Sequence, residues 1–122
     1  MANATSLIPL SGSTQGQATK VVATSTPGTL LHTTGTSASI VDRVWLWAFN
    51  SDTVVRVLTI EMGGATAPDQ NIVLPIPAQS GRVKVIDGEI LLGNGSAGLT
   101  IKAFCPTANV VTVAGIILRV TP

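Results

Sequence analysis

Short runs of β-branched residues, interrupted by Pro and Gly, constrain the fold of this chain more than any other feature of its sequence. Thr, Val and Ile supply about a third of the 122 residues, and these side chains suit a strand but lose χ1 freedom in a helix. The seven Pro and twelve Gly are spread along the whole length, so stretches long enough for a stable helix are scarce. The pattern therefore predicts an all-β chain.

Turn signals separate these runs at intervals typical of a β-sandwich or barrel. Asp87-Gly88 favours a two-residue type I′ turn between two strands. Pro75 and Pro77 cannot donate hydrogen bonds to a neighbouring strand, which favours a sheet edge for the run that ends there. The predicted strands are residues 18–24, 29–33, 40–49, 53–62, 71–76, 82–86, 89–92, 99–105 and 110–120.

The N-terminal residues differ in composition from the rest of the chain. Residues 1–17 are rich in Ser, Thr, Gly, Gln and Ala, and the stretch 11–17 resembles a flexible linker. We therefore expect an extended, flexible arm over residues 1–17 and one β-sandwich domain over residues 18–122. Leu7, Ile8 and Leu10 form an apolar patch on this arm, which we expect to add as a strand to a neighbour's sheet edge. The alternative is a tail without a role.

Charged residues are scarce, which indicates the kind of partner. Asp, Glu, Lys and Arg make up 11% of the chain, against about 25% in a typical soluble domain. The net charge is +1, and no basic cluster stands beside aromatic residues, so we expect no nucleic-acid partner. The longest uncharged apolar segment, residues 103–118, is shorter than the roughly 20 residues of a membrane helix. The N-terminus has no basic region, so we expect neither a signal peptide nor a membrane partner.

Several predicted strands are apolar on both faces. The strand at 40–49 carries Trp45, Trp47 and Phe49 on one face and Val44 and Leu46 on the other. A strand half exposed to water alternates apolar with polar residues, so this pattern requires cover on both sides. A domain of this size cannot cover several strands twice, and we expect some outer faces to meet other subunits.

Trp45 and Trp47 lie two residues apart and therefore side by side on one face of their strand. Two such rings can form a flat sugar-binding platform, or they can be core residues or anchors of a subunit interface. Glycan platforms usually draw on several exposed aromatic residues, and the chain has no Tyr. We therefore favour the core or interface role.

Residues that carry catalysis are few and dispersed. His32 is the only histidine, and a metal site or a triad would need partners from distant loops, so a satisfied or exposed strand histidine is favoured. Among the acids only Asp87 and Glu89 lie close together. Cys105 is the only cysteine and is expected in the core. We expect no enzyme activity, catalytic residue, metal, cofactor or small-molecule substrate, and a β-sandwich enzyme is the last alternative.

Four segments stand in a particular order after the Ser/Thr/Gly-rich start: GTLLHT (residues 28–33), VWLWAFN (44–50), VLTIEMGG (57–64) and IPAQSG (76–81). In this order they resemble small virion proteins of tailed bacteriophages. The resemblance covers most of the chain from Thr29 onward and implies a capsid decoration, or cement, protein. Such a protein is a single jelly-roll-like antiparallel β-sandwich that binds the outside of the assembled head and has no catalytic residues.

The resemblance implies a viral structural protein that stabilises the head through protein–protein contacts. Its partner would be the major capsid protein. Because charge is scarce and several strands are apolar on both faces, we also expect the chain to bind copies of itself, as a dimer or trimer. It would be made in the host cytoplasm and located on the outer surface of the virion head. A glycan- or receptor-binding module of a tail or fibre is the alternative. The expected protein-interface residues are Leu7, Ile8, Leu10, Trp45 and Trp47.

Overall fold

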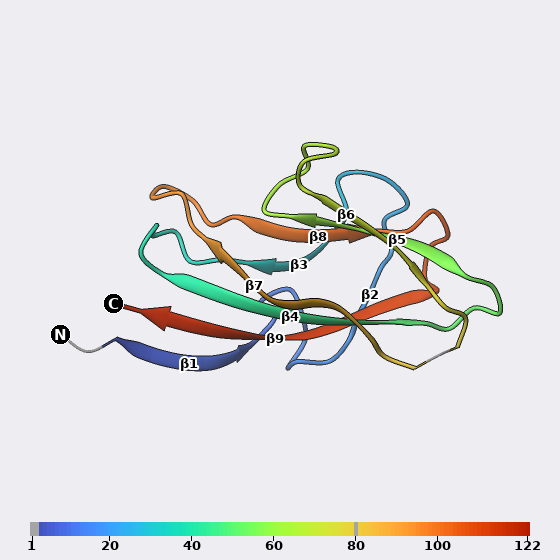
Figure 1. Ribbon diagram of the computed structural model, residues 1–122, viewed down its shortest axis with the longest axis horizontal. Helices are drawn as coiled ribbons and strands as arrows, with labels where there is room; N and C mark the ends of the chain where they lie inside the picture. Colours follow the sequence, from blue (N-terminus) through green and yellow to red (C-terminus); the bar gives the residue numbers. More distant parts are fainter. Residues whose placement is uncertain (1–2, 80) are drawn as a thin grey trace.

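Two antiparallel sheets packed face to face make up the protein (Figure 1). The computed structural model describes residues 3–79 and 81–122, and no helix occurs among them. The all-β sandwich predicted from the sequence is therefore confirmed. The strands are β1 Ala4–Pro9, β2 Thr19–Lys20, β3 Thr29–Thr33, β4 Val41–Asn50, β5 Arg56–Met62, β6 Asn71–Ile76, β7 Val83–Leu92, β8 Thr100–Phe104 and β9 Val111–Thr121.

The chain passes repeatedly from one sheet to the other. The first sheet has the order β1-β9-β4-β7, with β2 also pairing β9, and the second has the order β3-β8-β5-β6. Only the β1–β2 and β5–β6 connections stay within one sheet. The loop after Asn50 therefore crosses between the sheets, and Asn50 Nδ2 donates to the carbonyls of Val54 (2.8 Å) and Ile76 (3.0 Å). The turn residues Asn50-Ser51-Asp52 between two apolar runs favour a hairpin loop, but β4 and β5 belong to different sheets.

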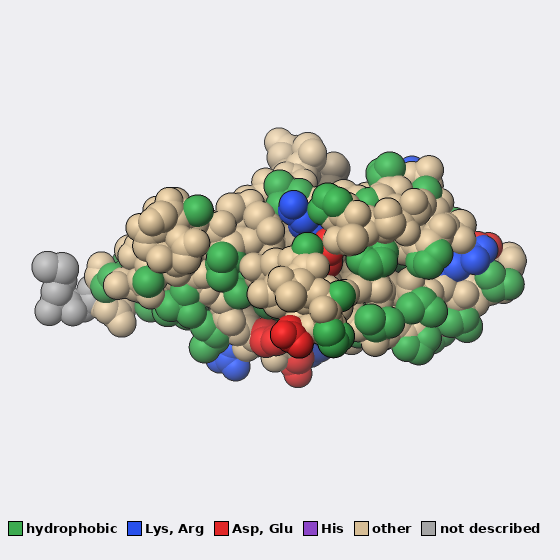
Figure 2. Space-filling view, turned by 90° about the horizontal axis from the view of Figure 1, so that it is seen from above, with side chains coloured by type: hydrophobic (Ala, Val, Ile, Leu, Met, Phe, Trp, Pro, Cys, Tyr) green, Lys and Arg blue, Asp and Glu red, His purple; other side chains and the backbone are tan. Residues whose placement is uncertain are grey.

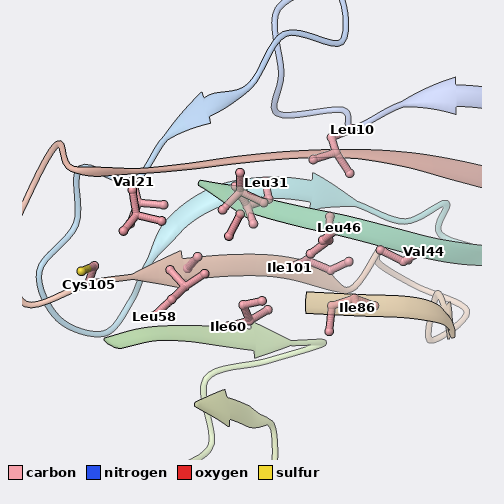
Figure 3. Packing of buried hydrophobic residues seen from close by; sticks show 14 of the residues in the cluster. Leu10, Val21, Leu31, Val44, Leu46, Leu58, Ile60, Ile86, Ile101 and Cys105 are labelled. Carbon is pink, nitrogen blue, oxygen red and sulfur yellow. The ribbon is translucent and has the colours of Figure 1, made fainter. Parts of the chain in front are cut away.

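The core lies between the sheets and is built from alternate residues of each strand (Figure 3). On β4, Val44 and Leu46 point inward and are fully buried. Leu58 and Ile60 of β5 and Ile101 of β8 meet them from the second sheet and are buried as completely. Because side chains alternate across a strand, the residues between these positions point away from the core.

Strand β7 differs from its prediction as two strands joined by a turn at Asp87-Gly88. It is continuous from Val83 to Leu92 and pairs with β4 through two register shifts. Gly88 has a φ of +79° at the first shift, which is the left-handed conformation typical of a bulge. Arg43 Nε donates to the Gly88 carbonyl at 3.0 Å. Strand β4 thus provides hydrogen-bond partners along β7 on both sides of Gly88. The extra residue forms a bulge, and the chain does not reverse direction there.

The N-terminal segment also differs from its prediction as a flexible arm. Strand β1 pairs antiparallel with β9 from Ala4 opposite Thr121 to Pro9 opposite Ile116. Leu10 follows and is 1% exposed, inside the core of the same chain. The segment has too little apolar surface to fold alone, but the edge of β9 supplies main-chain partners and the core accepts Leu10. Residues 1 and 2 of the expected arm lie outside the described residues.

Candidate protein-binding surface

An apolar surface covers the side of the first sheet that faces away from the core. Residues directly opposite each other in an antiparallel ladder point to the same side, so the register defines this surface. One row crosses β1, β9, β4 and β7 through Leu7, Leu118, Arg43 and Ile90. A second row crosses the same strands through Pro9, Ile116, Trp45 and Asp87. We call this surface the outer face of the first sheet. Its large apolar residues are Leu7, Ile116, Leu118, Trp45, Trp47 and Ile90.

The apolar residues of this face are well exposed. Leu7 is 74% exposed, Ile90 57% and Ile116 45%. Trp45 and Trp47 are half-buried and lie between them on β4. A monomeric soluble protein usually scatters such side chains singly, whereas here they are neighbours on adjacent strands. The outer face of the first sheet is therefore a candidate for contact with another protein.

The cationic side chains on this face contact neighbouring tryptophan rings and polar groups. The Arg43 guanidinium carbon lies 5.4 Å from the centre of the Trp45 ring, and Arg43 also donates to the Gly88 carbonyl. Lys84 Nζ lies 5.9 Å from the centre of the Trp47 ring and 3.5 Å from Asp87 Oδ1. Such cation–π contacts contribute about 0.5–1 kcal/mol at exposed sites. They hold the cations against the tryptophan rings, so the indoles are already partly covered.

The structure places the five residues predicted for an interface on two different sides of the first sheet. Leu7, Trp45 and Trp47 lie together on the outer face of the first sheet. Ile8 points to the opposite side and packs against the core, and Leu10 is inside the core. The strand period placed the two tryptophans on one face correctly, but it did not reveal which face would be turned to the core.

Sequence reasoning missed Ile116, Leu118 and Ile90 as members of this surface. The two-sided apolar pattern of residues 110–120 was the signal for Ile116 and Leu118, because both alternate with core residues. No comparable signal existed for Ile90, since the bulge at Gly88 interrupts the alternation along β7. The register between β4 and β7 was needed to place it.

The outer face of the second sheet is less continuous. Figure 2 looks onto this side of the sandwich, where hydrophobic side chains are separated by backbone and other side chains and by a few charged ones. Leu30, Val57 and Val73 are exposed there. Glu61 lies among them but is 1% exposed, because Thr26 Oγ1 and the Gly28 amide both donate to its carboxylate at 2.6 Å. The loop before β3 therefore covers part of this face.

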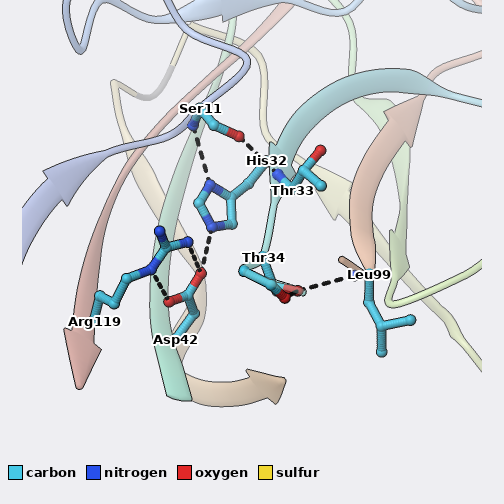
Figure 4. A network of polar contacts seen from close by, with 8 residues as sticks. Ser11, His32, Thr33, Thr34, Asp42, Leu99 and Arg119 are labelled. Carbon is cyan, nitrogen blue, oxygen red and sulfur yellow. Dashed lines mark hydrogen bonds and ion pairs between the residues drawn. The ribbon is translucent and has the colours of Figure 1, made fainter. Parts of the chain in front are cut away.

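A buried polar network lies beneath the first sheet (Figure 4). His32 of β3 and Asp42 of β4 are fully buried, with His32 Nε2 2.8 Å from Asp42 Oδ2. Arg119 of β9 donates through Nε to Asp42 Oδ1 at 2.7 Å and through a terminal nitrogen to Oδ2 at 2.8 Å. The Ser11 amide donates to His32 Nδ1 at 3.0 Å. The network thus links the N-terminal segment to strands of both sheets.

The hydrogen bonds define the charge state of this network. Burial lowers the pKa of the His32 imidazole below its ordinary value of 6.5, and the Arg119 charge adds to this against the opposing effect of Asp42. Burial alone raises the pKa of the Asp42 carboxyl, but the hydrogen bonds from Arg119 and His32 outweigh it, so that pKa lies below its ordinary value. At pH 7 the network holds a neutral imidazole and a carboxylate paired with a guanidinium.

Ser11, His32 and Asp42 occur together, but their geometry is not that of a nucleophilic triad. Nδ1 of the imidazole accepts a hydrogen bond from the backbone amide of Ser11. The Ser11 hydroxyl oxygen accepts a hydrogen bond from the Thr33 amide at 2.8 Å. A serine nucleophile must instead donate its hydroxyl proton to the imidazole. His32 and Asp42 are also sealed from solvent, so a substrate cannot reach them. These hydrogen bonds join the N-terminal segment to β3 and β4, and they are not those of a nucleophilic triad.

No protein-family model, curated protein or solved structure matches this chain. Within residues 3–79 and 81–122, no group of His, Cys, Asp or Glu side chains is placed to hold a metal ion. The same residues contain no helix long and apolar enough to cross a membrane. The physical character of the outer face of the first sheet is therefore what points to a function.

Proposed function

We propose that this chain is a decoration, or cement, protein of a tailed bacteriophage head, and that it binds through the outer face of the first sheet. The observation that carries this proposal is the apolar surface that runs from Leu7 across Ile116 to Trp45, with Ile90 beyond Arg43 at the far edge. Tryptophan is enriched where protein interfaces concentrate their binding energy, and charged residues are depleted there. A surface with two central indoles and tethered cations suits burial against protein.

The strand order supports a jelly roll as the finer description of the fold. A jelly roll places eight strands in two sheets as two Greek keys, and it recurs in viral capsid proteins. Here β1-β9-β4-β7 faces β3-β8-β5-β6, and β5–β6 is the one connection between sheet neighbours. Fold alone does not determine function, so the proposal depends on the surface and takes the fold as consistent with it.

Stabilisation of the head would follow from mass action. A subunit that binds the assembled shell but not its separated parts stabilises the shell by about 2.7 kcal/mol per site when its free concentration is 100 times its Kd. A standard interface buries about 800 Å² on each partner. A sheet face four strands wide is suited to an interface of this kind, whether the neighbour is the major capsid protein or another copy of the chain.

A glycan-binding module of a tail or fibre is the second candidate, because Trp45 and Trp47 are side by side and half-exposed. Sugars stack on the open faces of aromatic rings. Arg43 lies over the Trp45 ring and Lys84 over the Trp47 ring, so a sugar would have to displace a cation at each. This geometry favours a protein partner over a glycan.

The proposal is tested by introducing a charge on each of the two outer faces. Ile116→Asp places a carboxylate in the centre of the proposed interface, and Val73→Asp places one on the outer face of the second sheet, where Val73 is 61% exposed. Both variants are expected to fold, as measured by circular dichroism. Co-sedimentation with phage heads assembled without the chain should be lost for Ile116→Asp and kept for Val73→Asp.

Two results would contradict the proposal. A folded Ile116→Asp variant with unchanged occupancy on heads would exclude this face as the interface. The second candidate would be established instead if the parent chain did not bind phage heads but bound a glycan array, and if the Trp47→Ala variant lost the glycan binding.

A further inference from the structure

The N-terminal segment is attached to both sheets within a few residues. Strand β1 pairs with β9 in the first sheet, and the next residues are bound to β3 in the second. The Gly12 amide donates to the Leu31 carbonyl at 2.9 Å, and the Ser11 amide donates to His32 Nδ1 at 3.0 Å. The imidazole is therefore one of the groups that hold this segment where it leaves the sheet edge.

The bond from Ser11 requires one particular form of the imidazole. Because Nδ1 accepts the Ser11 amide proton, it carries no proton of its own. The neutral ring must then carry its proton on Nε2, which donates to Asp42 Oδ2 at 2.8 Å. A second proton has only Nδ1 to occupy, where it would face the Ser11 N–H directly. Protonation of His32 and its bond to Ser11 therefore exclude each other.

The groups around His32 compensate only in part for an added charge. Asp42 faces it from β4, but both carboxylate oxygens already accept from Arg119 of β9. On the β8 side, the residue opposite His32 is the apolar Ile101. The N-terminal segment presents only the Ser11 backbone N–H. An imidazolium in this position would share one carboxylate with a guanidinium and would have no acceptor at Nδ1.

We propose that His32 is an acid-sensitive latch, whose protonation at Nδ1 expels the Ser11 amide and releases residues 4–12 from the sandwich. In the released state His32 meets water and binds a proton more readily than in the closed state, where burial lowers the pKa of the imidazole. As the pH falls from the pKa of the released state toward the lower pKa of the closed state, each pH unit shifts the equilibrium toward release by up to tenfold. Release would uncover the β9 edge and remove Leu7 from the outer face of the first sheet.

The latch is testable because the chain has a single histidine, so its imidazole nitrogen signals need no assignment. At pH 7.5 nitrogen NMR should show the Nε2–H tautomer. On titration to pH 4, the protection factors of β1 amides and of Ser11, corrected for intrinsic exchange, should fall with the same midpoint as the imidazole titration. Amides of β4 should stay protected through that transition, because the rest of the sandwich remains folded.

Two variants connect the midpoint to the network. Arg119→Gln removes the cation that shares Asp42 with His32, so both the imidazole titration and the release should move to higher pH. Arg56→Gln is the matched control, since it breaks the Arg56–Asp52 ion pair in another part of the molecule and should leave both midpoints unchanged.

Three results would overturn the latch. The first is an Nδ1–H tautomer at neutral pH. The second is an imidazole that titrates while the protection of Ser11 and β1 stays constant. The third is simultaneous loss of protection in β1 and β4 at the imidazole midpoint, which would be acid unfolding of the whole domain. None of these depends on whether the chain binds phage heads.

Discussion

Removing the carboxylate of Asp42 should cost more stability than removing any carboxylate at the surface. Asp42→Ala deletes the acceptor of three hydrogen bonds, one from His32 and two from Arg119. His32 is fully buried, so its Nε2–H loses its partner without gaining water, which costs about 1–3 kcal/mol. The Arg119 side chain is 28% exposed and can turn to water, so its lost pair adds about 1 kcal/mol at most.

Together with the small cavity that alanine leaves, these losses give a decrease in the free energy of unfolding of about 2–4 kcal/mol. This is close to the cost of breaking a buried ion pair by removing one partner, about 3–5 kcal/mol. For a chain of this size each kcal/mol lowers the Tm by about 4 °C, so the Tm should fall by about 8–16 °C.

The measurement is urea denaturation at pH 7 combined with thermal melting. Asp52→Ala is the matched control, because Asp52 also pairs with an arginine, Arg56, but at the surface of the molecule. Its melting temperature should change little, since exposed ion pairs contribute little to stability. If Asp42→Ala unfolds at the same urea concentration as Asp52→Ala, the buried network does not stabilise the fold and the reasoning is refuted.

Two further substitutions test other contacts. Gly93→Ala should lower the free energy of unfolding by about 1–3 kcal/mol. A Cβ at this position would lie 2.1 Å from the Gly35 carbonyl oxygen, so the backbone would have to move. An unchanged Tm would contradict this prediction. Glu61→Gln should lower it by about 1–2 kcal/mol, since the amide replaces an acceptor with a donor facing Thr26 or Gly28. Limited proteolysis should then cut residues 24–28 faster than in the parent, and equal rates would show that Glu61 does not hold this loop.

The positions of most strands could be predicted from the sequence, because strand preference is a local property. Residues 29–33 and 71–76 were predicted with the bounds of β3 and β6, and the strand predicted at 40–49 is β4 displaced by one residue. The period of two also placed Trp45 and Trp47 on one face. Side-chain alternation and β-branching are present in the residues themselves, whatever the strand later pairs with.

Which residues lie on the candidate surface is determined by the pairing of strands that are distant in sequence. Leu7 and Ile90 join it only because β1 and β7 lie at opposite edges of one sheet, through β9 and β4. The same pairing turned Asp87-Gly88 from a predicted turn into a bulge, since an unbroken β4 edge offers hydrogen-bond partners on both sides of it.

The buried network was likewise decided by tertiary structure alone. His32 and Asp42 are ten positions apart, and Asp42 and Arg119 are 77 apart, on three different strands. In the sequence, each of these residues is an ordinary polar residue within a predicted strand. The local sequence does not specify which carboxylate will face which cation. The register of β4 against β9 puts Asp42 opposite Arg119, and the packing of the two sheets brings His32 to them. Burial then makes the three side chains dependent on one another, since a polar group removed from water must find its partner within the protein.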